Sequence, residues 1–140
     1  MFSGSIVAII TPFVDGGGID YAALKRLIEL HAAAGTSGIV VGGTTGESAT
    51  LTATEHAELI HRSVEMIDGR MHLIAGTGSN STAQTVALSK ATDVAGVYGF
   101  LLVAPYYNKP PQRGMITHFH AVADVVSKPV MLRCWPSIRT

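Results

Sequence analysis

The chain has 140 residues, of which 47% are hydrophobic and 14% charged, and its ten basic and ten acidic side chains give no formal net charge. This balance is typical of one well-buried globular domain and argues against a disordered chain. Because no basic run or stripe is present, nucleic acid is not an expected partner. No apolar stretch is long enough to span a bilayer, so no membrane association is expected either.

The cysteine and histidine content bears on the compartment and on metal chemistry. The only cysteine, Cys134, has no partner for an internal disulfide, and the chain starts without the pattern of a secretory signal, which together favour the cytoplasm. The six histidines are scattered, and His118 and His120 lie two positions apart on a helix-like segment, where they do not share a face. We therefore expect a cytoplasmic protein with no metal site and no cofactor.

Short apolar runs alternate along the chain with longer segments of helical periodicity. Five runs are predicted to be buried strands: Ser5–Thr11, Gly38–Val41, His72–Ala75, Gly99–Val103 and Pro129–Leu132. Four helices are predicted between them: one from Asp20 to Gly35, one from the Thr52-x-x-Glu55 capping box to Gly69, one from about Thr82 to Val94, and one with apolar positions from Met115 to Val126.

This order of elements predicts an α/β fold. Strands with no polar face, each followed by a helix, indicate a parallel sheet covered by helices. With right-handed crossovers, the same order is typical either of an open doubly wound sheet or of part of a (β/α)₈ barrel. No linker or second domain is visible, so we expect a single unit over residues 1–140.

The turn after the second predicted strand, within residues 41–56 (VGGTTGESATLTATEH), is rich in small and hydroxyl residues. In parallel α/β folds, ligands bind at the carboxyl ends of strands, where this turn lies. Gly42 and Gly43 would let the backbone approach a ligand, while Thr44 and Thr45 would offer hydroxyl and N–H groups beside a helix N-terminus. Two interpretations explain the stretch equally well. It forms either a pocket for a small carboxylate or phosphate, or a tight turn that only caps the helix.

Two later strand ends also carry polar turns. Residues 76–80 (GTGSN) match a dinucleotide fingerprint only in part, because the third glycine and a ribose-binding acid are missing, and a close-packed loop is favoured. In the turn of residues 105–110 (PYYNKP), Tyr106 and Tyr107 cannot both point into one core. One hydroxyl is therefore expected in a site or an interface, with ordinary surface packing as the alternative.

Four motifs, GSIVAIITPF, GTTGESATL, IAGTGSNST and APYYNKP, closely resemble the dihydrodipicolinate synthase family of pyruvate-dependent, class I aldolase-type lyases. The resemblance runs from Met1 to about Leu132 and implies a TIM barrel, here truncated after about five strands and four helices. In that family pyruvate forms a Schiff base with a lysine, and the enamine attacks aspartate semialdehyde to give 4-hydroxy-tetrahydrodipicolinate for lysine and diaminopimelate biosynthesis. The family's homotetramer, a dimer of dimers, implies a homo-oligomer.

The resemblance also implies roles for particular residues. Gly43, Thr44 and Thr45 would bind the carboxylate of pyruvate. Thr44 and Tyr107 would be catalytic members of a proton relay, with Tyr107 reaching into the site of a neighbouring subunit, because a phenol moves protons without carrying charge in the ground state. The family's feedback site for lysine matches five positions: Ser48, Ala49, His56, Asn80 and Tyr106.

Two features depart from the family. Arg133 stands where a second relay tyrosine is expected after the fifth strand, and residues 133–140 (RCWPSIRT) replace the usual pattern there. The Schiff-base lysine belongs on the sixth strand, which we expect to be missing from this sequence. The other lysines considered as nucleophiles lie on or near helices, away from strand ends: Lys25, Lys90 and Lys128. We therefore expect this chain alone to be inactive.

Two other functions fit the same residues: a related pyruvate lyase acting on sialic or keto-sugar acids, and a non-catalytic half-barrel that serves as an interaction protein. An open flavodoxin-like binding domain suits the length but gives the paired tyrosines no role. An incomplete barrel would leave two sheet edges and an apolar inner face uncovered, so self-association is expected.

Overall fold

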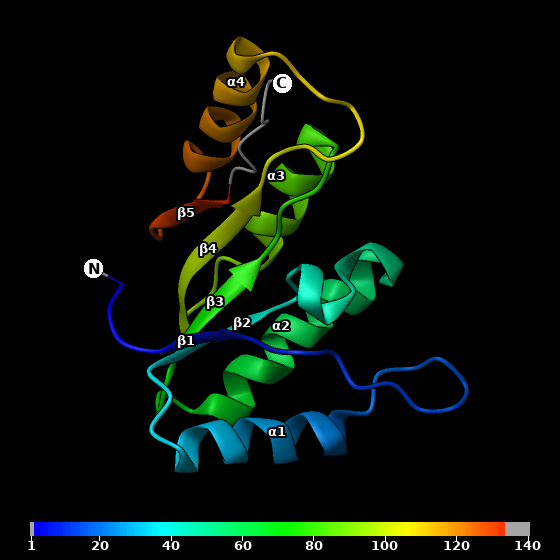
Figure 1. The fold of residues 1–140 in the computed structure, drawn as a ribbon, viewed down its shortest axis with the longest axis vertical. Helices are drawn as coiled ribbons and strands as arrows, with labels where there is room; N and C mark the ends of the chain where they lie inside the picture. The colour runs from blue at the N-terminus through cyan, green and yellow to red at the C-terminus, as the bar shows by residue number, and fades with distance from the viewer. Residues whose placement is uncertain (1, 134–140) are drawn as a thin grey trace, which may run out of the picture.

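The structure, a computed structural model, describes residues 2–133 and contains one sheet of five parallel strands (Figure 1). The strands are β1 (Ile6–Ala8), β2 (Gly38–Val41), β3 (His72–Gly76), β4 (Val97–Val103) and β5 (Val130–Arg133). The helices are α1 (Tyr21–Ala33), α2 (Ala53–Ile67), α3 (Thr82–Ala91) and α4 (Gln112–Ala123), and two short 3₁₀ turns, η1 (Thr44–Gly46) and η2 (Ser48–Thr50), precede α2.

The strand order is β1-β2-β3-β4-β5, so every strand pairs with its neighbours in the sequence. A doubly wound sheet would require this order to reverse partway. The predicted incomplete (β/α)₈ barrel, with five strands and four helices, is therefore confirmed over residues 2–133, and the doubly wound alternative is wrong.

Two strands differ in extent from their apolar runs. The run Ser5–Thr11 forms only the three strand residues Ile6–Ala8, although the Ile9 N–H still donates to the Val40 carbonyl at 3.1 Å. In contrast, β4 starts at Val97, before the predicted Gly99. A strand ends where its neighbouring strand no longer offers hydrogen-bond partners. An apolar run in the sequence does not show where that is, so hydrophobicity alone does not predict the ends of a strand.

Helix starts were predicted well where a capping side chain marks them. The Asp20 carboxylate accepts from the Ala23 N–H at 2.9 Å at the start of α1, and Thr52 and Glu55 form the predicted capping box of α2. The fourth helix instead starts at Gln112, before the first predicted apolar position at Met115. Its N-cap residue, Pro111, has an extended backbone and makes no side-chain capping bond, so the sequence lacks the usual signal there.

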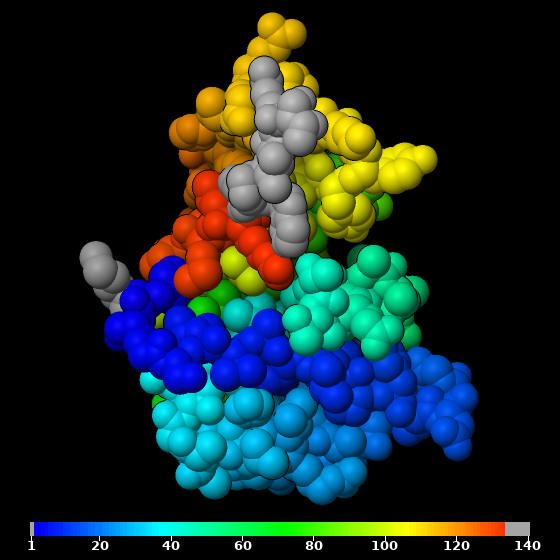
Figure 2. Space-filling view, in the orientation of Figure 1, coloured from blue at the N-terminus to red at the C-terminus, as the bar shows by residue number. Residues whose placement is uncertain are grey.

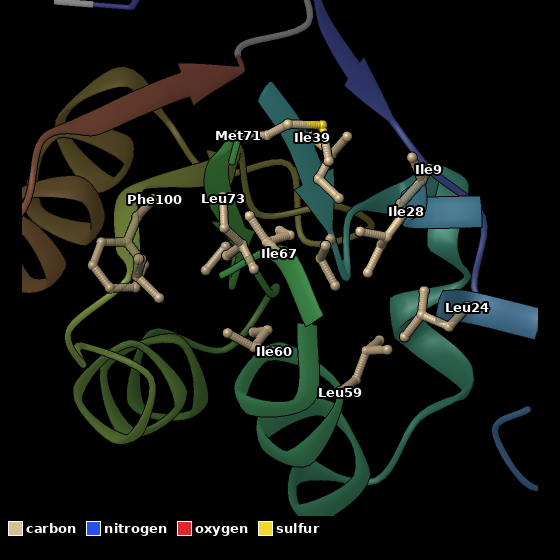
Figure 3. Packing of buried hydrophobic residues seen from close by; sticks show 13 residues of the cluster. Ile9, Leu24, Ile28, Ile39, Leu59, Ile60, Ile67, Met71, Leu73 and Phe100 are labelled. Carbon is tan, nitrogen blue, oxygen red and sulfur yellow. The ribbon is translucent and has the colours of Figure 1, made fainter. Parts of the chain in front are cut away.

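The hydrophobic core lies between the helices and one face of the sheet (Figure 3). Side chains at alternate strand positions point to this face. They come from β2 (Ile39, Val41), β3 (Leu73, Ala75) and β4 (Phe100), and pack with Leu24 and Ile28 of α1 and Leu59, Ile60 and Ile67 of α2. Burial of each large apolar side chain contributes roughly 1.5–3 kcal/mol to folding.

The opposite face of the sheet is the inner face of the incomplete barrel. Val40 and Ile74, which pair in register, lie on it and are only 5% and 0% exposed. Toward the β1 edge this face is more open, since Ala8, which pairs with Val40, is exposed. At the opposite edge of the sheet, Leu132 of β5 is 48% exposed on the helix-facing side, because it pairs with Leu102. Figure 2 shows the N-terminal segment (blue) and β5 (red) at the surface of one side of the molecule. The expected uncovered inner face is thus wrong for its centre, and exposure is concentrated in the edge strands.

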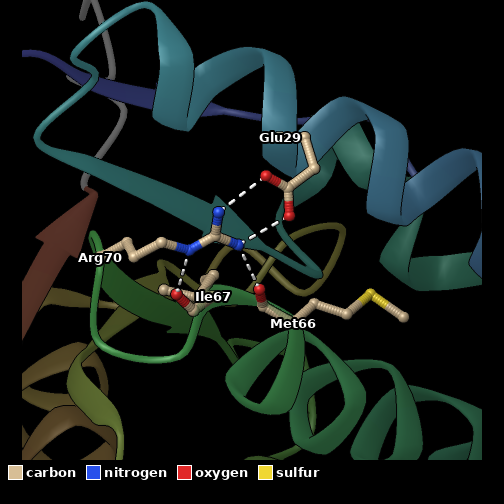
Figure 4. A network of polar contacts seen from close by, with 4 residues as sticks. All are labelled: Glu29, Met66, Ile67 and Arg70. Carbon is tan, nitrogen blue, oxygen red and sulfur yellow. Dashed lines mark hydrogen bonds and ion pairs between the residues drawn. The ribbon is translucent and has the colours of Figure 1, made fainter.

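A polar network joins α1 to the end of α2 (Figure 4). The Arg70 guanidinium contacts both carboxylate oxygens of Glu29 at 2.7 Å and donates to the carbonyls of Met66 at 2.7 Å and Ile67 at 3.0 Å. The hydrogen bonds from Arg70 lower the pKa of Glu29. Because this pair is exposed to water, it fixes the relative position of the two helices more than it stabilises the fold.

We predict that Leu24→Ala lowers the free energy of unfolding by about 2–5 kcal/mol, because it leaves a cavity in the core. Leu30→Ala on the same helix is the matched control: Leu30 is 61% exposed, so a change within about 0.5 kcal/mol is expected. Urea unfolding followed by circular dichroism measures both variants. Equal destabilisation by the two substitutions would contradict the packing of α1 described above.

Candidate active site at the carboxyl edge of the sheet

The carboxyl ends of β2, β3, β4 and β5 surround a cavity of about 370 Å³. Gly43, Thr44 and Glu47 line it from the turn after β2, Tyr106 lines it from the loop after β4, and Arg133 lines it at the end of β5. The turns that sequence analysis selected at three strand ends therefore meet at one edge, as expected for a parallel sheet.

Glycines allow these strand ends to approach each other. A Cβ atom added to Gly76 would lie 2.8 Å from both Cα and N of Gly43, and one added to Gly78 would overlap the backbone N of Val103. These contacts confirm the close-packed interpretation of residues 76–80. At Gly43 an added Cβ would meet only Val40 Cγ1, at 3.4 Å, so this glycine leaves more room than its neighbours.

Thr44 and Thr45 begin the 3₁₀ turn η1, and both side chains are exposed. The turn is closed by the bond from the Gly46 N–H to the Gly43 carbonyl at 3.0 Å and is held to the segment after β1 by a buried bond from Thr11 Oγ1 to the Gly46 carbonyl at 2.8 Å. Thr44 lines the cavity, whereas Thr45 does not.

A helix follows this turn, as the Thr52 capping box predicts, but its N-terminus does not border the cavity that Thr44 lines. The turns η1 and η2 intervene, and α2 begins only at Ala53. Glu47, between the two turns, adopts a left-handed conformation (φ 54°) and is the point where the chain changes direction. The start of α2 borders a different cavity, so its dipole does not act on the Thr44 side of the edge.

The two adjacent tyrosines point in different directions. Tyr106 is 46% exposed and lines the cavity, whereas Tyr107 is 93% exposed, has a left-handed backbone (φ 70°) and does not line it. The next residue, Asn108, donates from Nδ2 to the Asn80 carbonyl at 2.9 Å and so connects the loops after β4 and β3. Within one chain, Thr44 and Tyr107 are therefore not brought together at the cavity.

A second, larger cavity of about 730 Å³ lies between α2, α3 and the turn η2. Four of the five residues matched to the lysine feedback site line it: Ser48, Ala49, His56 and Tyr106. The fifth, Asn80, does not line it. The two cavities are adjacent, because Ser48, Ala49 and Tyr106 line both.

His56 is buried between the two cavities and is 6% exposed. Its ring lies against Gly42, where an added Cβ would overlap Nε2, and within residues 2–133 this Nε2 has no hydrogen-bond partner of good geometry. Burial lowers the pKa of His56, and the nearby carbonyls of Gly76 and Gly42 only partly oppose this. We conclude that the imidazole is neutral at pH 7 and helps to shape the turn at Gly42.

A second buried histidine, His118, joins α4 to α3. Its Nδ1 lies 2.9 Å from Thr82 Oγ1, the side chain is 3% exposed, and burial lowers its pKa. Sequence analysis considered His118 only as a metal ligand and missed this role. His118 precedes Phe119, an apolar residue that is also buried, and this position next to the apolar face of the helix was the available signal for a core position.

Within the described part of the chain, the cavity has no lysine and no cluster of metal-ligating side chains. None of the four lysines, Lys25, Lys90, Lys109 and Lys128, lines the 370 Å³ cavity. Among residues 2–133 no three histidine, cysteine or acidic side chains gather as a metal site would require. In the same residues, no helix has the length and apolar character needed to cross a membrane.

We predict that Gly76→Ala destabilises the fold by about 1–3 kcal/mol, because its Cβ would overlap backbone that has no room to move. Gly16→Ala is the control, since an added Cβ there meets nothing within 4 Å, and it should change stability by less than about 0.5 kcal/mol. Thermal unfolding compares the two. A Gly76→Ala protein as stable as the control would show that the strand ends are farther apart.

The buried histidines predict a dependence of stability on pH. Their pKa values are lowered in the folded chain, so below the ordinary value of about 6.5 the unfolded chain binds more protons than the folded chain. The free energy of unfolding should therefore fall as pH decreases from about 6.5 and be unaffected by these groups at higher pH. Urea unfolding at several pH values measures this slope.

Single substitutions separate the contribution of each buried histidine to the change of the unfolding free energy with pH. His56→Gln and His118→Gln should each reduce it, whereas His120→Gln, which removes an exposed histidine from the same helix as His118, should leave it unchanged. An unaltered slope in both buried-site variants would contradict the pKa shifts.

Comparison with known proteins extends the match to the whole chain. The family model for the dihydrodipicolinate synthetase family matches residues 1–140. The chain is 55% identical to 4-hydroxy-tetrahydrodipicolinate synthase of Persephonella marina, over 98% of this chain and 46% of that protein. Dihydrodipicolinate synthase of Aquifex aeolicus has a TM-score of 0.92 at 50% identity, covering 97% of this chain and 46% of its own.

The chloride-inhibited dihydrodipicolinate synthase of Acinetobacter baumannii, solved in complex with pyruvate, has a TM-score of 0.88 at 46% identity, covering 92% of this chain and 44% of its own. The chain thus spans about half the length of the relatives it matches. The motifs, the consecutive parallel strands and these similarities agree that the chain belongs to the dihydrodipicolinate synthetase family.

Proposed function

We propose that the 370 Å³ cavity is the part of a pyruvate-binding active site that this half of the barrel contributes. The observation that carries the proposal is the meeting of the Gly43–Thr44 turn with the ends of β4 and β5 around one cavity. The corresponding whole protein would condense pyruvate with aspartate semialdehyde to 4-hydroxy-tetrahydrodipicolinate, in the cytoplasmic synthesis of lysine and diaminopimelate.

In this proposal the turn after β2 binds the carboxylate of pyruvate. Thr44 offers a hydroxyl at the cavity, and the first N–H groups of a helical turn have no partner inside it. Gly43 leaves space for a ligand to approach the backbone, and Thr45 contributes from the following position. Neutral donors of this kind favour an anion without requiring a buried positive charge.

The proton relay of the proposal requires a second subunit. Tyr107 is 93% exposed and holds a left-handed backbone that costs energy in a residue other than glycine. Both features suit a side chain that becomes covered when another copy of the chain docks. We therefore assign Tyr107, with Thr44, to catalysis across an interface of a homo-oligomer, following the dimer-of-dimers tetramer of the family.

The Schiff base requires an amine that the described residues do not place at the cavity. Of the residues that the structure describes, Arg133 is the only basic one lining this cavity; its guanidinium stays protonated and can act neither as the carbonyl nucleophile nor as a relay phenol. We propose that residues 2–133 bind pyruvate without reacting, and that the reaction needs a lysine supplied by another part of the barrel.

The 730 Å³ cavity is proposed as the lysine feedback site. Ser48, Ala49, His56 and Tyr106 line it, while Asn80 would have to take part through movement of its loop, since its carbonyl is bonded to Asn108. A neutral His56 would present an uncharged face to the ammonium group of lysine. Because this cavity shares residues with the proposed active site, occupation of one would affect the other.

One observation also favours the non-catalytic alternative. A cavity to which the described residues contribute Arg133 but no lysine suits a half-barrel that binds a ligand or a partner without performing chemistry. Adding the rest of the barrel distinguishes the two functions. It should restore turnover if the chain is part of a pyruvate lyase, and should not if the chain is a non-catalytic half-barrel. No feature of the described residues favours sialic or keto-sugar acids over pyruvate.

We expect the isolated chain to bind pyruvate but to form no covalent adduct after treatment with pyruvate and borohydride, as measured by intact-mass spectrometry. Pyruvate binding, followed by NMR, should be lost in Thr44→Val and retained in Thr117→Val, which removes an exposed threonine of α4. An adduct on Lys25, Lys90, Lys109 or Lys128 would contradict the proposed lack of a nucleophile. Binding that survives Thr44→Val would contradict the role of the turn.

A further inference from the structure

Among residues 2–133, Arg133 is the one cationic side chain that lines the 370 Å³ cavity. Its backbone is fixed at the end of β5, where it pairs with Val103 and its carbonyl accepts from the Ala104 N–H at 3.1 Å. Within residues 2–133 its guanidinium takes part in no hydrogen bond or ion pair, in contrast to Arg62 and Arg70, which pair with acidic residues. The guanidinium is therefore free to bind an anion in the cavity.

The register of the strands directs this side chain to the inner face. Leu102 and Leu132 pair with each other, and Leu102 packs against the helices, so the next pair, Val103 and Arg133, belongs to the opposite face. Thr44 reaches the same cavity from the end of β2. The hydroxyl turn and the guanidinium thus occupy different walls of one space.

The separation of these walls exceeds what a three-carbon monocarboxylate such as pyruvate can span. Strands β2 and β5 are three strand spacings apart, roughly 14 Å along the sheet before curvature and the long arginine side chain shorten the gap. The volume of about 370 Å³ is also much larger than a three-carbon acid needs. A carboxylate held at the Thr44 turn leaves Arg133 available for a second anionic group.

We propose that Arg133 forms a second anion subsite in this cavity, so that the site takes short dicarboxylates, including 2-oxo diacids, in preference to monocarboxylates. The inference rests on the proposed function, because it takes the Gly43–Thr44 turn as the site of the first carboxylate. A planar guanidinium can hold the second carboxylate through two parallel hydrogen bonds.

Glu47 offers a second way to test whether charge in the cavity controls the binding of dicarboxylates. It lines the same cavity, is exposed and forms no ion pair with Arg133. Its carboxylate therefore repels a dianion more strongly than a monoanion. Glu47→Gln should tighten binding of a dicarboxylate more than binding of a monocarboxylate.

The test measures dissociation constants by isothermal titration calorimetry at low ionic strength for two matched pairs, succinate with butyrate and 2-oxoglutarate with pyruvate. The unmodified chain should bind each diacid about tenfold more tightly than its partner, as expected for one charge-assisted contact. Arg133→Gln should abolish this preference while pyruvate still binds. Arg133→Lys should keep part of it, since a lysine retains the charge but not the planar fork.

Arg113→Gln, which removes an exposed arginine of α4, is the matched control and should leave the preference unchanged. A diacid preference that persists in Arg133→Gln, or that is absent from the unmodified chain, overturns the inference. In the second case, pyruvate binding that still depends on Thr44 leaves the proposed function standing. Failure of all four acids to bind contradicts both, whereas diacid binding that requires Arg133 but not Thr44 contradicts the role of the turn.

Discussion

The backbone of Gly76 lies against the backbone of Gly43, and the position of the candidate site depends on this contact. A side chain on Gly76 would come within 2.8 Å of Gly43, so the turns after β2 and β3 approach each other only because residue 76 is a glycine. Gly78 makes a similar approach to Val103 of β4. Three walls of the cavity are thereby fixed by backbone packing, and the register of the sheet determines where Thr44 and Arg133 lie.

A consequence of this packing is that the two cavities share a wall. Ser48, Ala49 and Tyr106 line both, and the buried His56 lies against Gly42 at their boundary. Because burial keeps His56 neutral, the boundary carries no charge of its own, while the charges of the smaller cavity come from Arg133 and Glu47. The glycines and His56 thus set the shape of the cavities, while attraction of a ligand is the role proposed for Thr44 and Arg133.

The strand–helix order and the meeting of the turns could be predicted from sequence, because continuous apolar runs and the Thr52 capping box are local signals. Close packing of residues 76–80 was favoured because this stretch lacks the third glycine of a dinucleotide-binding motif. The outward direction of Tyr107 within one chain was expected from the resemblance, whereas the turns between Thr44 and α2 and the burial of His56 depend on contacts between distant segments. The start of α4 at Gln112 was missed because Pro111 caps it without a side-chain bond.

The central claim is that the turn after β2, held by the Gly43–Gly76 contact, is where this chain binds a small carboxylate. Titration of the ¹⁵N-labelled chain with pyruvate, followed through backbone amide chemical shifts, tests it most directly. The account predicts that the largest shifts occur at Gly43, Thr44 and Thr45. Shifts confined to the surface that Lys25, Glu29 and Arg70 form between α1 and the segment after α2, or no shifts at all, would contradict it.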